Sequence, residues 1–243
     1  MPTKNEIKTI RSLNLKKNRK EHGLFVAEGE KLISHFIKLG LKARHLFSTN
    51  VEQRVFGFEL VNNADMKRMS FLNSPSSCFA VFEIPKHPPL KIDLPLILVL
   101  DALRDPGNMG TILRLCDWFG VHQIICTDDC VDVFNEKVVQ ASMGSVAVTA
   151  AFYKTREEIA SFLKENDFTV YGADMNANSV YETNYQTKSA LILGNEGQGI
   201  SVELDDIISE RITIPAAQNA KAESLNVATA AAILLSDYSR KAN

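Results

Sequence analysis

The fold of this chain is decided by residues 96–114, which read LILVLDALRDPGNMGTILR. Five consecutive apolar residues, Leu96–Leu100, predict a strand that is buried on both faces, as strands of parallel sheets are. The polar segment Asp101–Gly110 predicts a loop, and the spacing of apolar residues from Thr111 to Phe119 predicts a helix that ends at Gly120. This strand–loop–helix unit indicates an α/β fold.

The same alternation of strands and helices is predicted farther along the chain. Further strands are expected at 122–126, 169–173, 190–193 and 211–214, and helices at 138–147 and 225–240. Strands that alternate with helices favour a largely parallel sheet with helices on both faces. Ligands of such sheets bind beyond the carboxyl ends of the strands, so a functional site is expected in the loops that follow the strands.

The amino-terminal part is predicted to form a smaller α/β unit of its own. Short strands are expected at 25–27 and 79–84, with a helix at 28–39. The stretch Pro85–Pro95 then has four prolines in eleven residues, and proline stiffens the chain and removes backbone donors. The predicted organisation is a first domain at 1–85, a linker at 86–95 and a second domain at 96–243.

The two parts carry opposite charge. Residues 1–92 have 16 Lys and Arg against 8 Asp and Glu, a balance of +8, whereas residues 93–243 have 11 against 21, a balance of −10. The positive part suits a polyanionic partner, and two solvated surfaces explain the charges equally well. Residues 1–24 alone hold seven of the cations at near-helical spacing, which predicts a basic helix or a solvated arm.

Composition excludes several classes of protein. Hydrophobic residues make up 45% of the 243 residues, which is ordinary for a globular protein and excludes a disordered or fibrous chain. No apolar run reaches the roughly 18 to 20 residues that a membrane helix needs, and the polar start Met1–Glu6 has no apolar signal core. The four cysteines lack metal-ligand or disulfide spacing, so we expect buried, reduced thiols in a cytoplasmic protein.

Two loops that follow predicted strands are rich in glycine and asparagine. In the first, Gly107 and Gly110 allow tight turns, Asn108 offers a donor and an acceptor, and Arg114 lies one turn into the following helix. In the second, residues 193–200 hold three glycines in six residues. A dinucleotide-binding fingerprint is expected after the first strand of its domain, whereas this loop lies late in the domain and is followed by residues 201–206, so a nicotinamide cofactor is disfavoured.

The third polar segment runs from Ile214 to the last predicted helix. Ser224 is a good helix N-cap, which places Asn226 in the first turn. Free N–H groups at such a terminus can bind a polar ligand group, although simple capping explains Ser224 as well. The alanine-rich sequence 228–232 allows another element to approach this helix closely.

Taken in order, the three segments resemble the SpoU/TrmH-type RNA ribose 2′-O-methyltransferases of the SPOUT superfamily. Asp105–Asn108 and Arg114 match the first family motif, Leu193–Gly199 the second, and Ile214-Pro215 with Ser224–Val227 the third. Residues 141–145 are similar to a smaller motif between the first two. The resemblance covers roughly residues 96–240; the third motif departs from the family at 216–219, where a Met and a Gly are usual.

The resemblance implies a parallel-sheet methyltransferase domain with a carboxyl-terminal trefoil knot, S-adenosylmethionine as cofactor, and a homodimer. The positions it implies for the cofactor are Leu193, Gly194, Asn195, Gly199, Ile214, Ser224, Leu225 and Val227. The positions it implies for catalysis are Asn108, Arg114, Glu196, Ser224 and Asn226. The amino-terminal unit is similar, at Leu24–Lys31, to the small substrate-binding domain of family members, which implies structured RNA as substrate, with ribosomal RNA the first choice and transfer RNA the second.

Two other functions are weighed against this one. A non-catalytic RNA-binding protein with a decayed knot domain is disfavoured, because all five expected catalytic positions are occupied by the family's residue types. A nucleotide-dependent oxidoreductase is disfavoured, because the glycine-rich loop lacks the sequence context of a dinucleotide site. The expected role of Arg114 is to grip a phosphate beside the target ribose, since a guanidinium is essentially always protonated and is a poor base.

Overall fold

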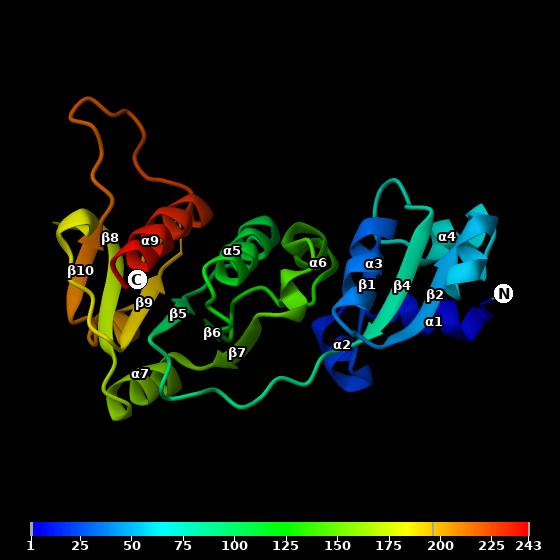
Figure 1. The fold of residues 1–243 in the computed structure, drawn as a ribbon, viewed down its shortest axis with the longest axis horizontal. Helices are drawn as coiled ribbons and strands as arrows, with labels where there is room; N and C mark the ends of the chain where they lie inside the picture. Colours follow the sequence, from blue (N-terminus) through cyan, green and yellow to red (C-terminus); the bar gives the residue numbers. More distant parts are fainter. Residues whose placement is uncertain (1, 196, 243) are drawn as a thin grey trace. The chain divides into compact units, whose positions relative to one another are not determined.

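The computed structural model describes residues 2–195 and 197–242, and the chain divides into two compact units. The first unit comprises the chain up to His87 together with Asp132–Ala147, and the second comprises Pro88–Val131 and the chain from Val148 onward. Figure 1 colours the elements of both units in sequence order. Between Glu83 and Leu96 the proline-rich stretch forms neither helix nor strand.

The first unit is built on a four-stranded sheet with the order β1-β4-β2-β3. Its strands are β1 (Leu24–Glu28), β2 (Ala43–Ser48), β3 (Glu59–Leu60) and β4 (Cys78–Glu83). Its helices are α1 (Lys4–Ser12), α2 (Lys16–His22), α3 (Glu30–Lys38), α4 (Asn63–Met69) and α6 (Glu136–Ser142), with 3-10 turns η1 (Val51–Phe56) and η2 (Ser145–Ala147). β4 runs antiparallel to both of its neighbours, with Val81 opposite Val26 and Phe79 opposite Phe47.

Hydrophobic side chains from both faces of this sheet hold the first unit together. On one face, Ile7 and Ile10 of α1 pack with Val26 and Phe79, and a capping box between Thr3 and Glu6 starts that helix. On the other face, aromatic side chains gather around Phe25. Its ring contacts those of Phe36, Phe82 and Phe134, with centroid separations of 5.6, 5.8 and 5.0 Å. Phe134 therefore explains why residues 132–147 belong to this unit.

The basic segment at the amino terminus differs from the single helix or solvated arm that was predicted. It forms two helices, and Arg19 of α2 is buried instead of facing solvent. The Arg19 guanidinium donates to Asp132 at 2.7 Å and to the carbonyl oxygens of Leu13 and Asn14 at 2.7 and 2.9 Å. Because a buried charge needs a full set of partners, this cation stabilises the fold and is not available to a polyanion.

The second unit is built on a six-stranded, wholly parallel sheet with the order β10-β8-β9-β5-β6-β7. Its strands are β5 (Leu96–Leu100), β6 (Gln123–Thr127), β7 (Ala150–Lys154), β8 (Thr169–Ser179), β9 (Ser189–Leu193) and β10 (Glu210–Thr213). Its helices are α5 (Pro106–Trp118), α7 (Arg156–Glu165), α8 (Val202–Asp205) and α9 (Val227–Ala242), with the 3-10 turn η3 (Val180–Glu182). The predicted parallel α/β sheet is confirmed.

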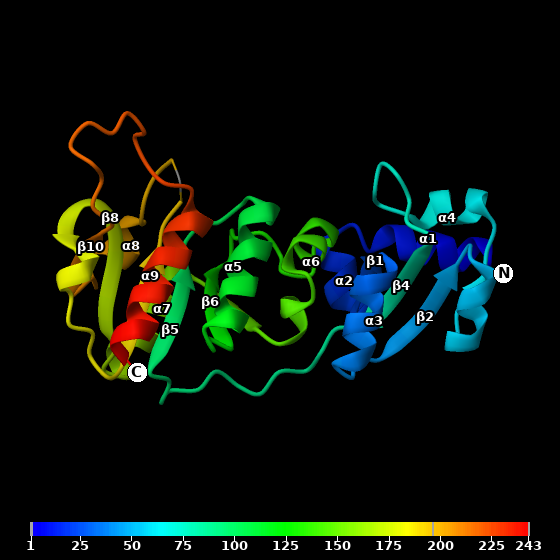
Figure 2. The same ribbon diagram turned by 45° about the horizontal axis from the view of Figure 1, so that its top comes forward.

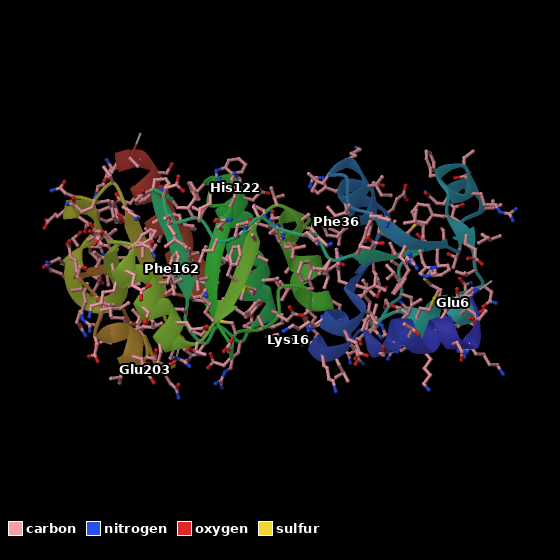
Figure 3. All side chains as sticks on the ribbon, turned by 90° about the horizontal axis from the view of Figure 1, so that it is seen from below. Glu6, Lys16, Phe36, His122, Phe162 and Glu203 are labelled. Atoms are coloured by element: carbon pink, nitrogen blue, oxygen red, sulfur yellow. The ribbon has the colours of Figure 1, made fainter. Side chains whose placement is uncertain are left out.

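Helices cover the second sheet in two pairs. α5 and α9 contact each other and lie side by side in both views (Figure 2). α7 and α8 form the other pair, and the helix residues Ile159, Leu163 and Leu204 share a hydrophobic core with Ile97 and Val99 of β5. Figure 3 labels Phe162 on α7 and Glu203 on α8. No helix in the described residues is both long and apolar enough to cross a bilayer.

Strand order places the ends of β5 and β9 next to each other. The chain moves outward from β5 through β6 to β7, then crosses to β8 and returns to insert β9 between β8 and β5. Leu100 and Leu193, the last residues of β5 and β9, are directly opposite each other. A point at which strand order reverses is where ligands of open parallel sheets bind, and the first two predicted loops leave the sheet there.

Several predicted boundaries are wrong, each for a local reason. α5 begins at Pro106 and not at Thr111, because the Asp105 side chain accepts from the Asn108 N–H and caps the helix. The helix predicted at 138–147 ends at Ser142, because Met143 and Gly144 take left-handed backbone angles. β7 and α7 were not predicted from the sequence.

Candidate functional site

The first polar segment joins β5 to α5. Because α5 starts at Pro106, Gly107, Asn108 and Gly110 belong to its first turns, and the expectation that the two glycines make loop turns is wrong. Asn108 is half-buried at this helix start. Arg114 lies farther along α5, where its side chain is exposed and makes no hydrogen bond or ion pair with a described residue.

The second polar segment is a tight hairpin after β9. The Asn195 N–H donates to the Gly199 carbonyl at 2.9 Å, and the Gly199 N–H donates back to Asn195 at 2.8 Å. Gly199 has a φ of +71°, which favours glycine. A Cβ on Gly194 would collide with the carbonyl group of Gly199 and the amide nitrogen of Ile200, so the hairpin can close only because residue 194 has no side chain.

The hairpin is bonded to the first segment. The Asn195 side-chain amide donates to the carbonyl oxygen of Ala102 at 2.9 Å, and the Asp101 N–H donates to the carbonyl oxygen of Leu193 at 2.9 Å. Glu196, an expected catalytic residue, lies outside the described residues.

The third polar segment connects β10 to α9. The predicted cap at Ser224 is wrong, because α9 begins at Val227 and the Asn226 side chain accepts from the N–H groups of Ala228 and Thr229 at 3.0 and 3.3 Å. Ser224 is exposed and makes no hydrogen bond among the described residues. Ile214 is half-buried, whereas Leu225 is 47% exposed and offers apolar surface next to the cap.

A hydrogen bond between two asparagines joins the third segment to the first. The Asn226 amide nitrogen Nδ2 donates to Oδ1 of Asn108 at 2.9 Å. Two side-chain hydrogen bonds, Asn226 to Asn108 and Asn195 to Ala102, therefore join the three segments at one end of the sheet, although the segments are distant in sequence. Neither Ile214 nor Ser224 takes part in a side-chain hydrogen bond with another described residue.

The hydrogen bonds that join these three segments come from asparagine side chains, and the Asp105 carboxylate caps α5 beside them. Asparagine side chains both donate and accept hydrogen bonds, so they can hold a ligand's hydroxyl and carboxyl groups without a net charge of their own. Arg114 adds an exposed cation on the helix that starts at the site. Such a set suits binding and orientation of a polar ligand beside an anion, more than proton abstraction by a side chain.

Two residues near the site were not predicted from the sequence. Asp101 is buried directly after β5 and forms an ion pair with Arg156 of α7 at 2.9 Å. The available signal was an acidic residue immediately after an apolar strand, since such a carboxylate is buried with the strand end and needs a partner.

Comparison with known families covers almost the whole chain. The SpoU rRNA Methylase family matches residues 95–236, and the MRM3-like substrate binding domain matches residues 4–80. Among curated relatives, the 23S rRNA (guanosine(2553)-2′-O)-methyltransferase RlmP of Bacillus subtilis (strain 168) is 29% identical, over 95% of this chain and 94% of that enzyme.

Solved structures share both units. A protein from Porphyromonas gingivalis assigned to the TrmH family of RNA methyltransferases is 38% identical, with a TM-score of 0.88 over 99% of both chains. The AdoMet-bound rRNA methyltransferase from Sinorhizobium meliloti is 30% identical, with a TM-score of 0.84 over 99% of this chain and 96% of that one.

The close approach at Gly194 predicts a stability effect. Gly194→Ala is expected to lower the free energy of unfolding by about 1–3 kcal/mol, because the added methyl group meets backbone that cannot move without opening the hairpin. The matched control is Gly197→Ala, whose Cβ would have only an ordinary 3.5 Å contact with Oδ1 of Asn195. Urea denaturation followed by circular dichroism measures both, and equal midpoints for the two variants would contradict the prediction.

Proposed function

Because this chain belongs to the SpoU rRNA methylase family, we propose that it methylates a ribose 2′-hydroxyl of ribosomal RNA where its three polar segments meet. The methyl donor is S-adenosylmethionine, with which the relative from S. meliloti was crystallised. The observation that carries the proposal is a pair of hydrogen bonds donated by side-chain amides, from Asn226 to Asn108 and from Asn195 to the carbonyl oxygen of Ala102. Both lie at the point where strand order reverses.

The residues present fit S-adenosylmethionine. Its adenine needs apolar contact, for which the third segment offers Ile214 and the exposed Leu225. Its ribose and amino-acid groups need donors and acceptors, which the exposed Ser224 and the half-buried Asn195 offer. We propose that the cofactor is held by the residues predicted from the sequence, namely Leu193, Gly194, Asn195, Gly199, Ile214, Ser224, Leu225 and Val227. When bound, it supplies an activated methyl group on a sulfonium.

The chain's own residues have to orient the ribose and stabilise its oxygen. Arg114 is exposed and has no partner among the described residues, so it is able to contact a phosphate and to stabilise negative charge that develops on the 2′-oxygen. Asn108 and Asn226 hold each other's side chains in fixed positions, and Asn108 orients the hydroxyl. The proposed catalytic set also includes Glu196 and Ser224.

Arg114→Ala tests this assignment. We expect 2′-O-methylation to fall by about 100-fold or more, the scale of removing one electrostatic contact made in the transition state, while the Kd for S-adenosylmethionine stays within about twofold of wild type. Methylation is measured by mapping 2′-O-methyl marks in ribosomal and transfer RNA from cells with wild-type, variant or no protein.

The control for Arg114 is Arg104→Ala, which removes an exposed cation from the same segment whose ion pair with Asp129 is 3.7 Å long. This variant should leave methylation unchanged. An equal loss of cofactor binding and methylation in Arg114→Ala overturns the assigned role, and marks confined to transfer RNA overturn the proposed substrate.

We propose that residues 1–85 bind the RNA, that 86–95 link the parts, and that 96–243 carry the methyltransferase site. The match of residues 4–80 to a substrate-binding domain supports this division, as does the excess of Lys and Arg in the first part of the sequence. With ribosomal RNA as substrate, we propose a cytoplasmic location. Lys4 and Lys8 of α1 and Lys17 and Lys20 of α2 are exposed and available to phosphates.

Replacing these four lysines tests the electrostatic part of the proposal. The variant with Gln at positions 4, 8, 17 and 20 should bind RNA more weakly at low salt. The slope of log K against log salt should become shallower by about 0.7–0.9 for each phosphate that the variant no longer neutralises. The matched variant with Arg at all four positions keeps the charges and should keep the slope. Filter binding over a salt series measures the slope for both variants. An unchanged slope in the Gln variant would show that these four lysines do not contact the RNA.

We also propose that two copies of the chain associate through α5 and α9. Trp118 on α5 is 83% exposed, and large exposed aromatic residues are typical anchors of interfaces. Arg114 precedes Trp118 by four residues on the same helix face, so a second copy on this surface lies beside the proposed catalytic group. On α9, the exposed or half-buried residues Thr229, Ala232 and Ser236 are small at helical spacing, which permits close packing.

Trp118→Asp tests the dimer. We expect sedimentation velocity to show a dimer for wild type and a monomer for the variant, because a charge at the interface centre is costly to bury. The control is Val202→Asp, which places the same charge at a 74% exposed position of α8, on the other pair of helices, and should leave the dimer intact. A dimer that persists in Trp118→Asp locates the interface elsewhere.

The path between β10 and α9 supports the trefoil knot typical of the family. β10 lies at the edge of the sheet beside β8, whereas α9 contacts α5, the helix that follows β5. The third segment must therefore pass across the ends of β8 and β9 to reach α9. We propose that the carboxyl-terminal segment is threaded in this knot.

A further inference from the structure

The carboxylate of Asp101 is buried and bonded at both oxygens beneath the site. It is 1% exposed. Oδ1 accepts from Nε of Arg156 at 3.1 Å and lies 2.9 Å from Nη2 in the ion pair. Oδ2 accepts from the N–H of Ser201 at 2.7 Å. Ser201 comes just after the Asn195 hairpin, so Asp101 fixes the exit of the hairpin while its own N–H fixes the entry at Leu193.

Arg156 connects this carboxylate to the loop after β6. Its Nη2 also donates to both oxygens of Asp129, at 3.2 and 3.0 Å. Asp129 in turn accepts from the Thr127 hydroxyl at 2.6 Å, and that hydroxyl accepts from the N–H of Ala102 at 2.8 Å. The network therefore returns to the residue next to Asp101.

Ala102 shows what the network holds in place. It is a buried, non-glycine residue with a φ of +53°, a conformation that costs about 1 kcal/mol or more for an L-residue. Thr127 bonds its N–H and Asn195 bonds its carbonyl oxygen. The peptide group before Ala102 is therefore hydrogen-bonded to the network through Thr127, and the peptide group after it is hydrogen-bonded to the hairpin through Asn195.

The charges in the network are mutually stabilised. Partial burial acts to raise the pKa of Asp129, but hydrogen bonds from Thr127 and Arg156 and the Arg156 charge bring it below its ordinary value. Burial acts to lower the pKa of Arg156, and Asp129 and Asp101 raise it above its ordinary value. Asp129 and Arg156 therefore both remain charged near neutral pH.

We propose that Asp101 and Arg156 are positioning residues for cofactor binding, acting by locking the Asn195 hairpin onto the end of β5. This inference rests on the proposed function, because it assigns the hairpin to S-adenosylmethionine. Neither side chain belongs to the proposed catalytic set. Removal of the pair should loosen the hairpin and weaken cofactor binding, without removing a group that acts on the ribose.

The test uses Asp101→Asn and Arg156→Met in the full chain. The amide of Asp101→Asn retains the size of the carboxylate and an acceptor for the Ser201 N–H, but it has no charge to pair with Arg156. For each variant, we expect the Kd and the KM for S-adenosylmethionine to rise about tenfold, the equivalent of one charge-assisted hydrogen bond, while kcat at saturating cofactor stays within about threefold. Combining the two substitutions should raise Kd little beyond either one alone, because both break the same link.

The matched control is Asp237→Asn. Asp237 has a similarly buried carboxylate, 3% exposed, that pairs with Lys241 at 2.8 Å. It lies in the last turns of α9, a helix of 16 residues and about 24 Å whose first turn is at the site. This variant should lower the melting temperature and leave the cofactor Kd unchanged, which separates positioning from general destabilisation.

The outcomes distinguish the inference from its premise. A folded Asp101→Asn with unchanged Kd, or variants in which kcat falls and Kd does not rise, overturn the positioning role. If Asp101→Asn fails to fold, Arg156→Met decides by the same criteria, since Arg156 is 26% exposed. A wild-type chain that gives no heat with millimolar S-adenosylmethionine in calorimetry refutes the proposed function instead.

Discussion

The parallel register of β5 with β9 is the constraint on which the site depends. Leu100 lies opposite Leu193, so the chain segments that leave these strands must start from adjacent points. Neither strand end could supply the site alone, because one brings a helix start with Asn108 and the other brings a hairpin with Asn195. The third segment joins them through the side chain of Asn226. Pairing of β5 with β9 thus fixes the first two segments of the site, and the hydrogen bond between the Asn226 and Asn108 side chains fixes the third.

The hydrogen bonds between the segments come from asparagine side chains, whereas the nearby carboxylate of Asp105 caps α5. Asn195 and Asn226 link the segments without adding net charge, and Asp101 is paired with Arg156 below them. Arg114 is left as an unpaired cation among the described residues. For a reaction in which a positively charged donor meets a ribose next to a phosphate, this separation matters. Asparagine side chains do not repel the sulfonium, and on the proposed assignment the exposed guanidinium of Arg114 contacts the phosphate.

Elements of the fold could be predicted from the sequence where the signal is local. Pro95 and Asp101 bracket five apolar residues, and β5 has the predicted bounds Leu96–Leu100. Prediction failed where two local signals competed. Asp105-Pro106 is a strong helix start, whereas Gly107 and Gly110, which follow it, favour a loop. Ser224 and Asn226 are both good helix caps. Asn226 is the residue that caps α9, and its side chain is also hydrogen-bonded to Asn108, 118 residues away in sequence.

Long-range pairing also decides which cations remain exposed on the surface. Arg19 is one of seven basic residues in a short segment, yet its bond with Asp132, 113 residues away, removes it from the surface. Residues 93–243 carry a net charge of −10, so over most of its surface the methyltransferase part repels a polyanion. On the proposed assignment, RNA affinity comes from the exposed lysines of the amino-terminal unit, and the exposed guanidinium of Arg114 is the place where a phosphate binds. On this view the acidic surface contributes to accuracy, because RNA that is not held by the basic unit gains little from approaching the site.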